Sequence, residues 1–295
     1  MGKVQRIAFG TIVVGAAVLS MKAGAWWLTG SAALYSDALE SVVNVVASVV
    51  AFVALQYSAR PADANHPYGH EKAELFSATI EGGLIIVAAF SIFQNAWRAW
   101  EHPAQLDAPW AALSLTVLST MMNGGWAAVL MRAGRIDRSP ALLADARHLY
   151  SDVVTSVGIV LGLGIVFATG LHWLDPVLAA ATAVHVLWSG LGVVRASVAG
   201  LMDEAPDGAT MRRIRTVVTE AADGALEAHD LRTRHAGRLT YLEFHLVVPG
   251  AMRVDEAHAI CDRVEAALKS QVEGLVVTIH VEPEGKAKHR GVLVL

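Results

Sequence analysis

Two apolar segments of the sequence each carry three polar residues at positions i, i+3 and i+7. The first set is Asp37, Glu40 and Asn44, and the second is Asp145, His148 and Asp152. At about 100° per residue, the members of each set fall within about 60° of one another on a helix. Carboxylates, an imidazole and a carboxamide suit divalent ions such as zinc, iron(II), manganese, cobalt or nickel. If the two helices face each other, this spacing predicts a divalent-metal site between them.

The composition indicates a membrane protein. The 295 residues are 54% hydrophobic and 17% charged, whereas an ordinary soluble domain has roughly 25% charged residues. The charge is uneven, because residues 1–202 hold 23 Asp, Glu, Lys and Arg and residues 203–295 hold 27. A net charge of −4 provides no basic surface for nucleic acid. The single cysteine, Cys261, can form neither an internal disulfide nor a thiolate cage, so we expect nitrogen and oxygen ligands for any metal.

Six stretches are long and apolar enough to cross a bilayer, which takes about twenty residues. They cover approximately residues 7–28, 32–57, 75–97, 110–131, 142–167 and 174–199. We interpret the first as a retained span, because no small-residue signal cleavage site precedes Lys22. Lys and Arg precede the first span and occur in the second and fourth connections, with Arg98 as an exception near the third connection. By the positive-inside rule, we expect both termini in the cytoplasm.

The two polar sets belong to an internal repeat. Residues 31–48 align without gaps on residues 139–156, at an offset of 108 residues and three spans. An odd number of spans places the two copies in opposite orientations. Such an inverted repeat is typical of secondary transporters, with the substrate near the interface of the two copies.

The depth of each polar residue in its span affects what it can do. Asp37 and Asp145 lie early in their spans, where a carboxylate can simply cap a helix or reach the membrane surface. The other four residues lie deeper, where an ionisable group that faces lipid costs roughly 2.5–3.5 kcal/mol. We therefore expect those four as ligands, with Asp37 and Asp145 in support. Two further charged residues within spans, Lys22 and Glu81, could pair with nearby opposite charges.

From residue 203 the pattern becomes that of a soluble domain. Residues 211–222 and 254–268 have amphipathic helical spacing, residues 239–248 and 275–281 read as strands, and residues 228–234 add a further strand. This order predicts a small α+β domain of the ferredoxin-like kind. We therefore predict three parts: a six-span transport domain (1–202), a cytoplasmic domain (203–285) and a loose tail (286–295).

Four segments of the chain resemble the cation diffusion facilitator family of divalent metal/proton antiporters. They are residues 30–37, 65–74, 144–152 and 228–234, and the similarity is greatest to the bacterial zinc and iron efflux branch. The resemblance implies that the transport ligands are Glu40, Asn44, His148 and Asp152. The first pair departs from the family's usual Asp or His followed by Asp, because Glu40 has a longer side chain and Asn44 lacks a charge.

The resemblance also implies two further metal sites and one ion pair. A site in the second connection would use Asp63, His66 and His70, although histidines in a loop with proline and glycine can also be ordinary surface residues. A binuclear regulatory site at the interface of a homodimer would use the cytoplasmic residues His229, His245, His258, His280 and Glu282. Lys72 and Asp203 correspond to a charged interlock between the third and sixth spans. The alternative is that these two are unpaired surface charges.

Together, the patterns and the resemblance imply an exporter of the inner or plasma membrane that moves a divalent transition metal out of the cytoplasm in exchange for protons, and the resemblance alone implies that it is a homodimer. Zinc, iron(II), manganese, cobalt, nickel and cadmium are candidate substrates and regulatory ligands, and no prosthetic group is expected. Its partners would be metal ions, protons, the lipid bilayer and a second copy, but not nucleic acid. An enzyme is not expected, because the chain has no nucleophile elbow, phosphate loop or zinc-protease helix. The alternative is a non-transporting metal sensor or scaffold that binds metal through its cytoplasmic domain.

Overall fold

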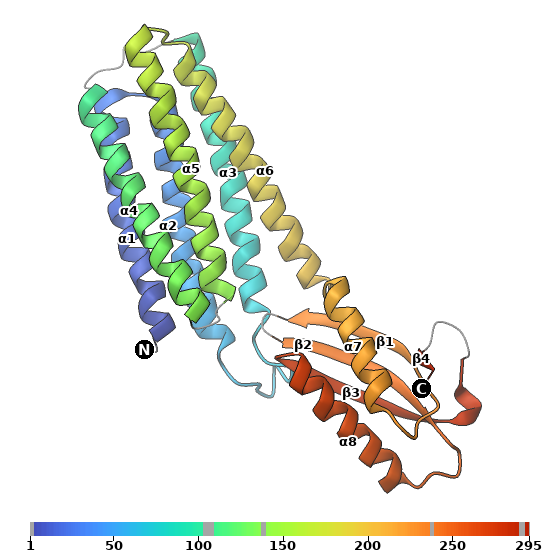
Figure 1. The fold of residues 1–295 in the computed structure, drawn as a ribbon. Coiled ribbons are helices and arrows are strands. Elements are labelled where there is room, and N and C mark those ends of the chain that lie inside the picture. Colours follow the sequence, from blue (N-terminus) through green and yellow to red (C-terminus); the bar gives the residue numbers. More distant parts are fainter. Residues whose placement is uncertain (1–2, 103–108, 137–139, 237–238, 289–292, 295) are drawn as a thin grey trace. The chain divides into compact units, whose positions relative to one another are not determined.

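The computed structural model describes residues 3–102, 109–136, 140–236, 239–288 and 293–294 (Figure 1). The chain forms two compact units, one of residues 1–56 and 77–195 and the other of residues 57–76 and 196–295. The second unit includes the connection 57–76, which the sequence assigned to the transport domain. The predicted loop site therefore lies in the same unit as the cytoplasmic sheet.

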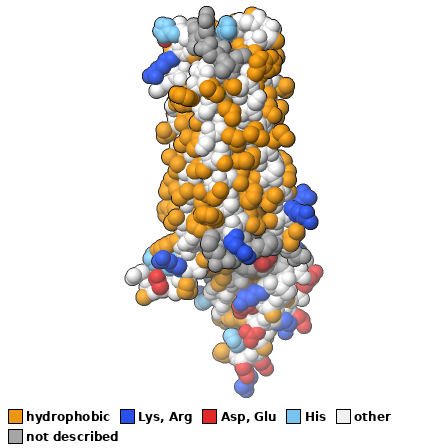
Figure 2. Space-filling view, turned by 90° about the vertical axis from the view of Figure 1, so that its left-hand side faces the viewer, with side chains coloured by type: hydrophobic (Ala, Val, Ile, Leu, Met, Phe, Trp, Pro, Cys, Tyr) orange, Lys and Arg blue, Asp and Glu red, His pale blue; other side chains and the backbone are white. Residues whose placement is uncertain are grey.

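Six long helices contain the predicted spans. They are α1 (Lys3–Thr29), α2 (Ala32–Ser58), α3 (Ala73–Glu101), α4 (Pro109–Ile136), α5 (Pro140–Thr169) and α6 (Leu174–Leu201). Each contains an apolar stretch long and hydrophobic enough to cross a bilayer, so the prediction of six spans is confirmed. Large apolar side chains such as Trp188 and Val154 are exposed, and hydrophobic side chains cover the helical part of the face in Figure 2. An apolar surface of this kind suits the hydrocarbon core of a bilayer, where there is no water to solvate polar groups.

Small residues let these helices approach closely. Helix α4 packs against α1 and α5, with Ala25 and Ala112 completely buried in the shared core. A Cβ atom on Gly82 of α3 would lie only 2.6 Å from Cγ2 of Val194 on α6. Close packing of small residues is the usual basis of helix association in lipid, where no hydrophobic effect drives helices together.

The first turn of α2 is capped by a residue from α6. Asp175 is buried and accepts hydrogen bonds from the backbone N–H groups of Ala32 (2.7 Å) and Ala33 (3.1 Å). The hydroxyl of Ser31 donates to the same carboxylate at 2.5 Å. A carboxylate at this position satisfies N–H groups that the helix itself leaves unpaired, and it also interacts favourably with the positive end of the helix dipole. The cap therefore fixes the start of the helix that carries Glu40 and Asn44.

The second unit contains one mixed sheet with two helices packed on one of its faces (Figure 1). In chain order its elements are α7 (Gly208–Ala221), β1 (Glu227–Ala236), β2 (Leu239–Val248), α8 (Val254–Gln271), β3 (Leu275–Pro283), the 3-10 turn Glu284–Lys286 and β4 (Leu293–Val294). The strand order is β3-β2-β1-β4; β1 is antiparallel to β2 and β4, and β2 is parallel to β3. The prediction of a cytoplasmic α+β domain is confirmed.

The core of this domain shows which side chains of β2 face the helices and which face away from them. Leu242, Phe244 and Leu246 pack into a buried cluster with Ile214 of α7 and Val264 of α8. Because side chains alternate along a strand, His245 belongs to the opposite face of the sheet. The two helices therefore pack on the face opposite His245 and do not cover the face that carries it.

The end of the chain differs from the predicted loose tail, 286–295. Leu293 and Val294 form strand β4, with Leu293 opposite Ala228 and Val294 opposite Glu227. Lys288 also contacts β1, as described below. Residues 289–292 and 295 of the predicted tail lie outside the described residues.

Candidate metal centres

The centre within the spans joins α2 to α5 through Asn44. Its Nδ2 donates a hydrogen bond to Oδ2 of Asp152 at 2.5 Å, and its Oδ1 lies 3.0 Å from Nε2 of His148. An amide oxygen can only accept, so Nε2 of His148 carries the proton in this arrangement. The second oxygen of Asp152, Oδ1, is 4.0 Å from the same nitrogen. Three of the four predicted ligands therefore form one connected cluster.

Glu40 completes this set. Its Oε2 atom is buried and has no hydrogen-bond partner among the described residues. Glu40, Asn44 and His148 line a small cavity, together with apolar residues of α2, α3 and α6 and Ser189. The space open to the centre of a water-sized sphere is about 10 Å³, which is enough for roughly one water molecule or ion. The structure thus brings all four predicted transport ligands to one place.

The position of this cluster follows from the internal repeat. Asn44 and Asp152 are 108 residues apart and occupy equivalent places in the two copies. Residues related by a two-fold axis can touch each other only near that axis. Their contact is therefore what an inverted repeat requires of a site at its interface.

The two outer carboxylates contact α1 instead of the cluster. Asp37 forms an ion pair with Lys22 (Nζ to Oδ1, 2.8 Å) and accepts a hydrogen bond from Ser156 at 2.8 Å. Asp145 accepts a weaker hydrogen bond from Thr11 at 3.3 Å. The expectation that Lys22 pairs with an opposite charge is confirmed.

Glu81 of α3 extends the polar surroundings of the cluster. It is partly buried and lies within electrostatic range of His148 and Asp145. Its carboxyl group therefore belongs to the polar surroundings in which a cation would bind.

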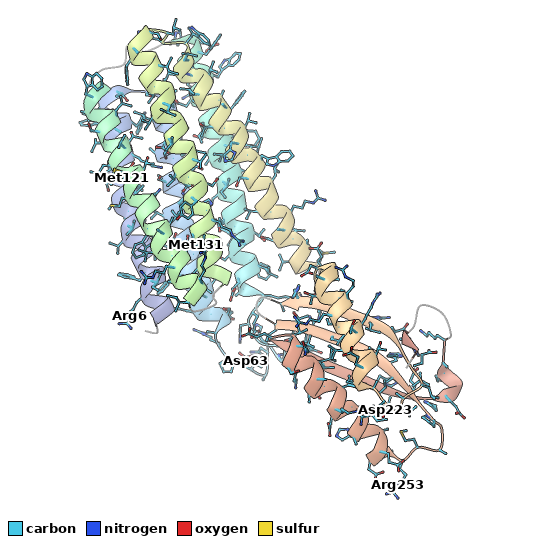
Figure 3. The ribbon with its side chains drawn as sticks, in the orientation of Figure 1. Arg6, Asp63, Met121, Met131, Asp223 and Arg253 are labelled. Carbon is cyan, nitrogen blue, oxygen red and sulfur yellow. The ribbon has the colours of Figure 1, made fainter. Side chains whose placement is uncertain are left out.

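A second group lies in the connection between α2 and α3, where Figure 3 labels Asp63. Oδ1 of Asp63 is 3.2 Å from Nδ1 of His66, and its Oδ2 is 3.4 Å from Nε2 of His70. One ligand atom from each of the three residues lies within 4.8 Å of the other two. A hydrogen bond from the backbone N–H of His66 lowers the pKa of Asp63, so its carboxylate stays charged. The three predicted loop residues form one cluster.

A third group forms a row across the cytoplasmic sheet. His229 on β1 is opposite His245 on β2, and His245 is opposite His280 on β3. Glu282 joins the row: its carboxylate lies 3.2 Å from Nε2 of His229, 3.2 Å from Nδ1 of His245 and 3.8 Å from Nε2 of His280. The first two nitrogens are buried without a hydrogen-bond partner among the described residues. Buried imidazole nitrogens that converge on a carboxylate form a suitable ligand set for a borderline metal such as zinc.

His258 is the exception among the predicted cytoplasmic ligands. It lies on α8, is 74% exposed, and its Nε2 is 3.6 Å from Oδ1 of Asp262 on the same helix. Within one chain the other four predicted residues come together, and the five-residue site at a dimer interface stays a prediction. The physical reason for the separation of His258 is that α8 packs on the face of the sheet opposite the histidine row.

Two residues beside this row were not predicted. Glu227 is buried and lies 2.8 Å from Nδ1 of His229 while accepting the backbone N–H of Lys288 at 2.7 Å. Asp230, at a bulge in β1 with a φ of 54°, can offer an oxygen close to His229 and His245 and forms an ion pair with Lys288. The sequence did contain a signal for Glu227, because residues two apart on a strand, such as Glu227 and His229, lie on the same face of the sheet.

The predicted interlock between Lys72 and Asp203 is present at 3.0 Å, so the alternative of two unpaired charges is wrong. The hydrogen bond from Lys72 lowers the pKa of Asp203.

Arg234 lies 3.8 Å from the carboxylate of Asp203 and stacks over the rings of Tyr68 and Tyr241. The hydroxyl of Tyr241 also donates to the carbonyl of Tyr68 at 3.0 Å. These contacts tie the loop that carries His66 and His70 to strands β1 and β2.

Comparisons with known proteins match nearly the whole chain. The family model of the cation efflux transmembrane domain matches residues 8–202, and that of the cation efflux protein cytoplasmic domain matches residues 206–284. The uncharacterized transporter sll1263 of Synechocystis sp. is 40% identical over 277 residues, which are 93% of this chain and 89% of that protein. The cation-efflux pump FieF of Klebsiella pneumoniae is 31% identical over 280 residues, which are 95% of this chain and 93% of that protein. A solved structure whose title names CzrB in a zinc form is 52% identical, covers 29% of this chain and 98% of its own, and has a TM-score of 0.28.

Proposed function

This chain belongs to the cation diffusion facilitator family of cation efflux transporters, and from that premise we propose that it exports a divalent transition metal in exchange for protons. The observation that carries the proposal is the cluster of Glu40, Asn44, His148 and Asp152, in which the first three line a cavity about the size of one ion and Asp152 bonds to Asn44. Its ligand set of two carboxylates, an imidazole and an amide oxygen suits zinc and iron(II), and also manganese, cobalt, nickel and cadmium.

Exchange follows from the chemistry of these ligands. The nitrogen of His148 that faces Asn44 can hold a proton or a metal ion but not both. In the structure this nitrogen and a carboxylate oxygen of Asp152 are both occupied by hydrogen bonds with the Asn44 amide. A metal ion at Nε2 of His148 would replace those hydrogen bonds, and an imidazolium, which has a proton on both nitrogens, must release one of them before Nε2 can bind the ion. Binding of metal and of protons therefore exclude each other, which is the requirement for antiport.

We assign the rest of the chain accordingly. Residues 1–202 form the transport domain, 203–285 the cytoplasmic domain and 286–295 a terminal segment that returns to β1. The excess of Lys and Arg in alternate connections supports an inner-membrane or plasma-membrane protein with both termini in the cytoplasm. The row of His229, His245 and His280 with Glu282 binds a regulatory metal. The cytoplasmic domain forms the homodimer, and the exposed His258 joins the regulatory metal site at the dimer interface.

The test uses the purified full chain in proteoliposomes that contain a pH-sensitive dye. Zn²⁺, Fe²⁺, Mn²⁺, Co²⁺, Ni²⁺ and Cd²⁺ are added in turn, and metal uptake and proton release are followed together. The wild type is expected to couple uptake of at least one metal to proton flux, and His148→Ala to abolish both. His172→Ala, which changes an exposed histidine in the connection between α5 and α6, serves as the control and should transport normally. Unchanged coupled flux in His148→Ala would refute the proposal.

A second function, that of a metal sensor or scaffold, is favoured by one observation. Nε2 of His229 and Nδ1 of His245 have no hydrogen-bond partner among the described residues, whereas Asn44, His148 and Asp152 in the membrane are hydrogen-bonded to one another. The same proteoliposomes distinguish the two functions. If the wild type moves none of the six metals but the full chain binds zinc at equilibrium, and His245→Ala abolishes that binding, the sensor function is correct.

A further inference from the structure

A lysine is buried beside the transport site. Lys22 lies in α1, where its side chain is only 1% exposed. Its ammonium group donates hydrogen bonds to Oδ1 of Asp37 at 2.8 Å and to Oγ of Ser156 at 3.1 Å. Ser156 in turn donates to Asp37 at 2.8 Å. Three helices, α1, α2 and α5, thus meet at one buried cation.

This triad forms the next layer of the polar stripes that carry the ligands. Asp37 lies one helical turn before Glu40 on α2, and Ser156 lies one turn after Asp152 on α5. The charge of Lys22 is close enough to interact with those of Glu40 and Asp152 as well as that of Asp37. No lipid-facing or interfacial role fits a lysine that is enclosed in this way.

The formal charges of the two layers match one divalent ion. Among the ligands and the triad of Lys22, Asp37 and Ser156, the carboxylates Asp37, Glu40 and Asp152 contribute three negative charges and Lys22 contributes one positive charge. Asp145, which accepts a hydrogen bond from Thr11, and Glu81 lie outside this set. The sum of −2 is neutralised by a single M²⁺ ion. Without Lys22 the sum would be −3, and the buried site would keep a negative charge after the ion binds. Uncompensated charge in a site of low dielectric is strongly unfavourable.

We propose that Lys22, held by Asp37 and Ser156, is a positioning and charge-balancing residue of the transport site that keeps metal binding weak enough for release. The inference rests on the proposed function. It predicts that removal of the lysine charge alone tightens metal binding and slows turnover, whereas removal of the Asp37 charge alone weakens binding. Removal of both charges together restores the balance.

The experiment compares Lys22→Met, Asp37→Asn, the double variant Lys22→Met/Asp37→Asn and Lys22→Arg, with Ser20→Ala, an exposed position on the same helix, as control. Zn²⁺ and Cd²⁺ are titrated in detergent onto each full chain carrying His229→Ala/His245→Ala, so that the cytoplasmic row does not contribute, and transport is measured in proteoliposomes. From the attraction between an extra unit charge and a divalent ion one or two turns away, we expect on the order of tenfold tighter binding and slower transport in Lys22→Met, and about tenfold weaker binding in Asp37→Asn. The double variant and Lys22→Arg should fall within about threefold of the wild type.

Two results would overturn the inference. The first is that both single variants bind metal with the affinity of the wild type. The second is that the affinity of the double variant differs from that of the wild type by as much as the affinities of the single variants do, or by more. A purely structural role predicts the second result, because two lost contacts would then damage the site more than one. If Lys22→Met does not fold, Asp37→Asn and the double variant still decide between these outcomes. Failure of the proposed function is recognised separately, because the wild type would then transport no metal while its equilibrium binding could still be measured.

Discussion

Replacement of Asn44 by aspartate tests how the amide at the transport site sets its affinity. In the structure Nδ2 of Asn44 donates to Oδ2 of Asp152 at 2.5 Å. Asn44→Asp replaces that donor by a carboxylate oxygen, so two carboxylates face each other in the empty site. A bound divalent ion would lie between them and attract both. The substitution therefore destabilises the empty site and stabilises the loaded one.

The expected magnitude follows from Coulomb's law. Two unit charges about 4 Å apart repel by about 4 kcal/mol at an effective dielectric constant of about 20. Part of this repulsion is relieved when the carboxylates separate or share a proton, so we expect Asn44→Asp to bind zinc roughly 10- to 100-fold more tightly above neutral pH. Because a shared proton must leave when metal binds, the affinity of the variant should fall more steeply with decreasing pH than that of the wild type.

The assay is a titration of Zn²⁺ onto the full chain between pH 6 and pH 8, with His229→Ala/His245→Ala as the background so that the cytoplasmic site does not contribute. Asn44→Ala is the companion variant: it removes the amide without adding charge and should bind more weakly than the wild type. Equal or weaker zinc binding by Asn44→Asp at every pH would refute the reasoning, because it would mean that residue 44 does not face the ion.

Three further predictions follow from other contacts. Asp175→Asn weakens the cap on α2 and should lower the free energy of unfolding by about 1–2 kcal/mol, measured as thermal stability in detergent; an unchanged melting temperature would show that the cap adds nothing. The lowered pKa of Asp203 means that its ion pair with Lys72 stabilises the fold fully above the ordinary aspartate pKa near pH 4, and that this stabilisation is lost as the pH falls through the lower folded-state pKa. Lys72→Met should therefore lose less thermal stability below pH 4 than the wild type does. Parallel curves of melting temperature against pH for the two proteins would count against the pair. Glu227→Gln removes the carboxylate that orients His229 and should weaken zinc binding at the cytoplasmic row about tenfold, as measured by titration of the full chain, with equal affinities as the contrary result.

The sequence predicted the parts of the molecule that depend on local pattern or on the repeat. The six spans follow from hydropathy, because a bilayer fixes the length of an apolar helix. The clustering of Glu40, Asn44, His148 and Asp152 follows from helical spacing and from the repeat, which requires equivalent polar stripes to meet. Whether these residues bind metal remains a prediction that the transport assay must test.

The parts that escaped prediction depend on contacts between distant segments. No local pattern shows that Asp175 caps a helix more than a hundred residues earlier, or that Lys22 selects Asp37 as its partner. Strand alternation assigns His245 to a face of the sheet but does not give the register that places it between His229 and His280. The same limit applies to the position of His258, because amphipathic spacing defines a helix without defining which face of the sheet the helix covers.

The most direct test of the account is proton flux driven by a zinc gradient in proteoliposomes, measured for variants that separate the three metal centres. The account predicts that flux persists when the loop centre is removed by His66→Ala/His70→Ala and when the cytoplasmic centre is removed by His229→Ala/His245→Ala. It predicts that flux disappears in Glu40→Gln/His148→Ala, although this variant still binds zinc through its cytoplasmic domain. Zinc-driven proton flux at the wild-type rate in Glu40→Gln/His148→Ala would contradict the central claim that the ion crosses the membrane through this site.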